Sequence, residues 1–120
     1  MKKKSNKPAP LKLSTTEVSA LCNALDFLAH CESFSYNTVN FDHKDVIRMA
    51  WAIESNNTVE KRRDFRIALA AIDLSVHALK TDSPELEQVS SVFPELIPNL
   101  KDSLSLLEVF RPRLVAHAAK

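Results

Sequence analysis

The segment 58–80, TVEKRRDFRIALAAIDLSVHALK, decides the fold of this chain. Its apolar side chains recur every three or four residues, which is the period of an α-helix. They fall on two sides of that helix. One side carries Phe65, Leu69, Ile72, Val76 and Leu79, and the other carries Ile67, Ala70, Ala71, Leu74 and Ala78. A helix that is apolar on two sides needs neighbours on both. The segment therefore predicts either the central helix of a bundle or a helix with one side in a protein interface.

Two helices are predicted before this segment. Ser14 and Glu17 form a capping box, and an apolar pattern of helical period then continues to about Glu32. A second helix is predicted from Asp42 or His43 to a turn at 55–57, and its wide apolar arc indicates a helix packed on more than one side. We also expect the side chain of Asn57 to cap the third helix at its N-terminus.

The chain after the segment predicts one or two more helices. The sequence Ser-Pro-Glu at 83–85 combines a capping residue, proline at the first helical position and an acid, and residues 86–110 stay in helical phase. Pro94 and Pro98 interrupt this phase, because each lacks a backbone donor and clashes with the preceding turn. We expect a kinked helix or two helices broken there, and a further stop at Pro112.

The expected fold class is therefore all-α, a single-domain bundle of four to five helices over residues 14–120. The 120 residues suffice for one domain with its own core. The chain contains no glycine. This absence excludes the glycine-rich phosphate loops of both the Walker type and the dinucleotide-binding type.

Charge is distributed unevenly along the chain. Residues 1–13 hold five lysines and no acid, whereas the remainder carries a net charge of −4. We predict that 1–13 is a flexible basic arm. Two interpretations of the arm stay open: it contacts an acidic surface, RNA or DNA, or it only increases solubility.

The sequence predicts a cytoplasmic protein that does not cross a membrane. The basic start at 1–4 is followed by a polar stretch instead of the apolar core of a signal peptide, and no apolar run approaches the length of a membrane span. Cys22 and Cys31 are too far apart along one helix to form a disulfide, and free thiols are typical of a reducing compartment.

A basic cluster at the start of the third helix is the candidate nucleic-acid site. It consists of Lys61, Arg62, Arg63 and Arg66. Cations at a helix N-terminus oppose the helix dipole, so their presence there indicates a compensating role. A short turn between the second and third helices also gives the order of a helix-turn-helix. The alternative is a solvated face whose cations pair with nearby acids.

Three other groups of residues have a chemical and a structural interpretation. Cys22, Asp26 and His30 are spaced along one flank of the first helix and are all competent zinc ligands, but a free cysteine there fits the core equally well. Asp73 and His77 form a carboxylate–imidazole pair that either orients a general base or is a surface ion pair.

Arg111 and His117 make up the last of these groups. Their spacing is similar to that of the Arg–His pair of HEPN-type ribonucleases, which are also small helical bundles, but the likeness covers two residues only. A small nuclease or metal-dependent enzyme therefore stays as a third hypothesis. The chain has no serine nucleophile elbow and no paired-carboxylate motif, so we expect no catalysis, no metal and no cofactor.

The function that the sequence favours is a non-catalytic protein-binding module, an adaptor or regulator whose partner is another protein or a second copy of itself. Its predicted interface is the second side of the third helix together with loop aromatics and a tryptophan: Ile67, Ala71, Leu74, Phe34, Tyr36 and Trp51. The acidic segment 81–110 offers a face for a basic partner. The alternative function is a nucleic-acid-binding regulator that uses the basic cluster and the lysine arm.

Overall fold

The computed structural model describes residues 10–31, 34 and 39–118. Tyr36 and the lysines of residues 1–9 lie outside these described residues. The described elements are β1 (Leu11–Lys12), α1 (Thr15–His30), α2 (His43–Asn56), β2 (Thr58–Val59), α3 (Arg62–Thr81), α4 (Pro84–Val92) and α5 (Leu96–Ala118). The prediction of an all-α, single-domain bundle is confirmed.

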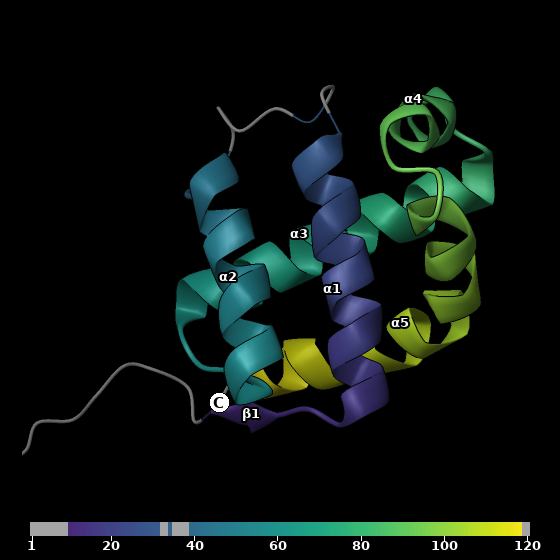
Figure 1. The fold of residues 1–120 in the computed structure, drawn as a ribbon. Helices are drawn as coiled ribbons and strands as arrows, with labels where there is room; N and C mark the ends of the chain where they lie inside the picture. Colours follow the sequence, from purple (N-terminus) through teal and green to yellow (C-terminus); the bar gives the residue numbers. More distant parts are fainter. Residues whose placement is uncertain (1–9, 32–33, 35–38, 119–120) are drawn as a thin grey trace, which may run out of the picture.

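The helices form two crossed layers (Figure 1). Helices α1 and α2 lie side by side and run in opposite directions, and α3 crosses behind both of them. Helix α1 packs against α2, α3 and α5, and α3 packs against α1 and α5. The short helix α4 packs against α3 and α5. The core therefore lies where α1, α3 and α5 meet, with α2 on one side of it.

Side chains from these three helices fill the core. Phe27, Phe65 and Phe110 come from α1, α3 and α5 and are at most 1% exposed. Burying a large apolar side chain contributes roughly 1.5–3 kcal/mol. The capping box predicted for α1 is present: the Ser14 amide donates to Glu17 Oε1 at 2.9 Å, and the Glu17 amide donates to Ser14 Oγ at 3.2 Å.

The start of the third helix differs from the prediction. Helix α3 begins at Arg62, and Thr58–Val59 forms the strand β2, which pairs antiparallel with β1. Asn57 does not cap α3 but ends α2 in the left-handed conformation, at φ 57° and ψ 30°. Its carbonyl accepts a hydrogen bond from the Leu13 amide at 2.8 Å. The left-handed conformation of Asn57 and the pairing with β1 keep residues 57–59 outside both helices.

The conformation of Asn57 yields a stability prediction. Asn57→Val is expected to lower the free energy of unfolding by about 1–3 kcal/mol, because a β-branched residue is strained at positive φ. Asn57→Gly is the matched control and is expected to stay within about 0.5 kcal/mol of the parent, because glycine takes this conformation freely. Urea denaturation of the three proteins measures the difference. Equal stability of the two variants would contradict this account.

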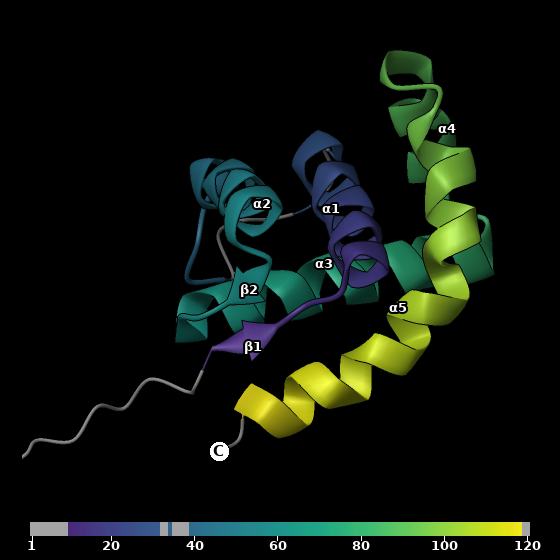
Figure 2. The same cartoon turned by 60° about the horizontal axis from the view of Figure 1, so that its bottom comes forward.

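The C-terminal region confirms one expectation and corrects another. The predicted break is present: α4 ends at Val92, α5 begins at Leu96, and Pro94 lies between them, while Pro98 occupies the first turn of α5. Pro112 was expected to stop the helix, but α5 continues through it to Ala118. Phe110 and Leu114 are buried on either side of Pro112, and their packing offsets the lost hydrogen bond. Figure 2 shows α5 as a strongly curved helix.

Candidate functional site

The predicted interface on α3 is part of the core. Ile67 and Ala71 are 0% exposed within a single chain, and Leu74 is half-buried against the core. The interpretation of these residues as an intermolecular surface is therefore wrong for Ile67 and Ala71. The reason is that α1 and α5 pack on two sides of α3 and cover both apolar faces. The other interpretation of the two-sided pattern, a central helix, is confirmed.

Of the predicted interface aromatics, Phe34 is packed against the core and Trp51 is exposed. The Phe34 ring stacks on Phe41, with centroids 6.4 Å apart, and is packed against the core. Trp51 on α2 is 70% exposed, so α2 is not covered on that side as its apolar pattern had indicated. Tyr36 lies outside the described residues. Of the predicted interface residues that the structure describes, Trp51 is thus the one that a partner can reach most readily.

A cleft of about 750 Å³ lies between α2 and the start of α3. Four cationic and three acidic side chains line it, together with short polar and apolar ones: Asp45, Arg48, Met49, Ala52, Asn56, Thr58, Glu60, Lys61, Arg62, Arg63 and Asp64. We call this the cationic cleft. Three of the four residues predicted for nucleic-acid binding line it, and the fourth, Arg66, is exposed on α3 outside the lining.

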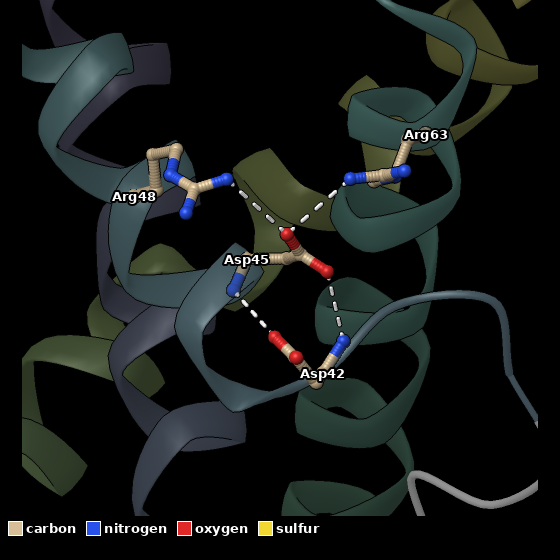
Figure 3. Close-up of polar contacts among 4 residues, drawn as sticks. All are labelled: Asp42, Asp45, Arg48 and Arg63. Carbon is tan, nitrogen blue, oxygen red and sulfur yellow. Dashed lines mark hydrogen bonds and ion pairs between the residues drawn. The ribbon is translucent and has the colours of Figure 1, made fainter.

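Asp45 connects the two walls of the cationic cleft. Figure 3 shows its carboxylate between two guanidinium groups: Oδ1 lies 3.5 Å from Nη1 of Arg48 and 3.4 Å from Nη1 of Arg63. Asp45 is itself held by Asp42 in the capping box of α2, with reciprocal hydrogen bonds of 2.9 and 3.0 Å. The backbone amide of Asp45, which donates to Asp42, lowers the pKa of the Asp42 carboxyl. Because one carboxylate serves two arginines, both guanidinium groups keep donors for a further anion.

Sequence reasoning missed the contribution of α2 to this cleft. Arg48 and Asp45 are three residues apart and so neighbours on one helix face, which is a signal that the sequence does carry. Nothing local in the sequence places that face beside Arg63. Burial raises the pKa of Asp64 at the base of the same cleft.

The small sheet places residues 11–12 beside the chain that leads into α3. Leu11 pairs with Val59 and Lys12 with Thr58 in antiparallel register. Thr58 lines the cationic cleft, so Lys12 pairs with a residue of its lining. Lys2, Lys3, Lys4 and Lys7 precede this strand in the sequence and lie outside the described residues.

The flank formed by Cys22, Asp26 and His30 has structural contacts. The Cys22 thiol donates to the Ala50 carbonyl at 3.9 Å, and burial, with the nearby Glu54 and Asp26, raises its pKa to about 12. His30 Nδ1 lies 2.8 Å from the Asp26 carbonyl oxygen. Among the described residues, no three His, Cys, Asp or Glu side chains are grouped as a metal site requires. Cys22 therefore has the contacts of a residue packed between α1 and α2.

Asp26 gives a prediction with a defined pH dependence. Burial raises its pKa above the ordinary value of 3.8, so the ionised carboxylate destabilises the folded state relative to the unfolded one. The stability that protonation contributes is present below pH 3.8 and is lost as the pH rises through the folded-state pKa. Asp26→Asn is therefore expected to be more stable than the parent at pH 7, with the gain shrinking as the pH falls towards 4. Urea denaturation at several pH values measures this, and a less stable variant at pH 7 would contradict it.

The remaining candidate catalytic residues pair differently from the predictions. Asp73 binds Arg111 rather than forming a pair with His77: Nε and Nη2 of Arg111 lie 2.5 and 3.1 Å from its two carboxylate oxygens. This bidentate contact raises the pKa of Arg111 and ties α5 to α3. The His117 ring stacks on Phe65 at a centroid distance of 5.6 Å. Arg111 and His117 thus have separate contacts on α3.

The comparisons with known proteins found no family model, no curated protein and no solved structure that matches this chain. Within the part of the chain that the structure describes, no helix combines the length and the apolar character needed to span a membrane. The site must therefore be interpreted from its own chemistry.

Proposed function

We propose that this chain is a non-catalytic protein-binding module, an adaptor or regulator, that recognises an acidic segment of a partner protein at the cationic cleft. The observation that carries the proposal is the combination of Arg48 and Arg63, which face each other across the cleft, with Trp51 at 70% exposure on the same helix as Arg48. Arginine and tryptophan are the residue types that most often dominate binding energy in protein interfaces.

The geometry of α2 places these residues on one surface. Arg48 and Trp51 are three residues apart and so neighbours on the helix; Arg48 lines the cleft, and Trp51 lies outside its lining. A partner segment that places carboxylates between the arginines and an apolar side chain on Trp51 would use both kinds of contact. The acids Asp45, Glu60 and Asp64 leave the cleft with a small net positive charge. Because the cleft carries both signs of charge, it fits a protein segment that also carries both better than it fits a continuous row of phosphates.

Binding of nucleic acid is the second candidate function. The specific observation that favours it is the pairing of β1 with β2, which places Lys12 opposite Thr58, a residue that lines the cationic cleft with Lys61 and Arg62. Against it stands the net charge of −4 on residues 14–120, since nucleic-acid-binding domains are usually strongly basic. The prediction of a cytoplasmic location is supported by Cys22, which is a free thiol.

Trp51 provides a direct readout, because it is the sole tryptophan of the chain. The experiment titrates the protein with an acidic amphipathic peptide of about 12 residues. Added salt is expected to weaken its binding, because salt screens the attraction between the peptide carboxylates and the cationic cleft. The expected result is a saturable change in tryptophan fluorescence. Lys61→Glu is expected to weaken peptide binding about tenfold or more, since it places a like charge at the cleft. Lys101→Glu, with the same charge change on α5, is the matched control and should leave binding unchanged.

A parallel titration with an oligo-dT strand separates the two functions. Tighter binding of the strand than of the peptide, with an affinity that falls steeply with salt, would replace the protein-binding proposal by the nucleic-acid one. The same result would be expected to depend on Arg62 and on residues 1–9. Absence of binding to either probe would overturn both.

A further inference from the structure

Helix α3 separates two ends of opposite charge. Its 20 residues span about 30 Å, from Arg62 beside the cationic cleft to Thr81 beside α4. Figure 2 shows the same separation, with β1 and β2 near the start of α3 and α4 near its end. The helix dipole adds to this asymmetry, because its positive end lies at the cleft.

The end of the molecule at α4 is acidic and partly apolar. Glu87, Glu95 and Asp102 are exposed there, as is Asp82, which follows the last residue of α3. Lys101 is the one cation among the residues from 82 to 103. Val92, the last residue of α4, is 70% exposed. This end therefore offers carboxylates together with an exposed apolar side chain, which is the chemistry that the cationic cleft and Trp51 would recognise.

The basic arm cannot readily neutralise the acidic end of its own chain. The nine residues before Pro10 reach at most about 30 Å when fully extended. They begin at the opposite end of α3, which is itself about 30 Å long. A complementary contact is therefore easier between two copies than within one.

We propose that the cationic cleft of one copy binds the α4 end of a second copy. This inference rests on the proposed function of the cleft and adds the identity of one acidic occupant. The contact joins two different surfaces, so it is head-to-tail and leaves a free cleft at one end of an open assembly and a free α4 end at the other. A free acidic peptide competes with the second copy for the cleft.

Sedimentation velocity over a range of chain concentrations tests the proposal. At about 0.05 M salt the average mass is expected to rise with concentration above the 13.5 kDa of one chain, and at about 0.5 M salt it should return to that value. Deletion of residues 1–9 should weaken the association. The acidic peptide should dissociate it.

Two charge-reversed variants provide the decisive measurement. The cleft variant carries Lys61→Glu and Arg63→Glu, and the α4-end variant carries Glu87→Lys and Glu95→Lys. Each is expected to be monomeric alone, because each then presents two ends of like charge. Their equimolar mixture is expected to associate again to a mass of at least twice that of the monomer, since the intact α4 end of the first fits the intact cleft of the second. Such recovery also shows that both variants are folded.

The outcomes separate this inference from the function on which it rests. A parent protein that stays monomeric at low salt but binds the acidic peptide would overturn the self-association and leave the proposed function standing. Failure of both measurements would overturn both. Association that persists in either variant alone, or a mixture that shows no recovery although circular dichroism shows both variants folded, would also overturn the head-to-tail contact.

Discussion

Ile67→Ala is expected to lower the free energy of unfolding by about 2–5 kcal/mol, the range measured when a buried isoleucine or leucine is reduced to alanine. Ile67 is 0% exposed in a single chain, between helices that pack on both sides of α3. The substitution removes apolar contacts and leaves a cavity that rigid helices fill incompletely. The loss is expected to be the same at low and high protein concentration, because the contacts lie within one chain.

Trp51→Ala is the matched control for this prediction. Trp51 is 70% exposed, so its removal is expected to change the free energy of unfolding by no more than about 0.5 kcal/mol. The same variant should lose affinity for the acidic peptide. Urea denaturation at two chain concentrations distinguishes the two positions. Ile67→Ala with parental stability, or with a loss that disappears at high concentration, would return Ile67 to an interface between chains.

The sequence predicted those elements whose signals are local. Ser14 with Glu17 specified the start of α1, and the sequence Ser-Pro-Glu at 83–85 specified the start of α4. In both cases the side chain that caps the helix lies within three residues of the amide it binds. Pro94 likewise separates α4 from α5 through its own missing donor. The helical period of residues 58–80 indicated a two-sided helix but could not distinguish neighbours within the chain from a partner.

The parts that sequence reasoning missed depend on contacts between distant residues. The strands β1 and β2 are two residues long and pair across more than 40 positions, too short for any period to appear. Asn57 adopts the left-handed conformation that glycine would otherwise supply, in a chain without glycine. The cationic cleft was half predicted: Lys61, Arg62 and Arg63 were chosen for their charge, whereas Arg48 joined them only through the packing of α2.

Replacing Leu11 and Leu13 together by alanine is expected to lower the free energy of unfolding by about 5 kcal/mol, at roughly 0.8 kcal/mol for each buried carbon removed. Both were placed in the flexible arm 1–13, yet they are only 9% and 7% exposed. Leu11 lies in β1 opposite Val59, and the Leu13 amide is bonded to the Asn57 carbonyl. These residues therefore belong to the folded domain and close the core beside the start of α3.

Lys12→Ala tests the same strand without touching the core. Lys12 lies between the two leucines and is exposed, because successive side chains of a strand point to opposite faces. Its replacement is expected to stay within about 0.5 kcal/mol of the parent. Urea denaturation compares the three proteins. If the double leucine variant were as stable as Lys12→Ala, residues 11–13 would be part of the arm, and the pairing of β1 with β2 would lose its support.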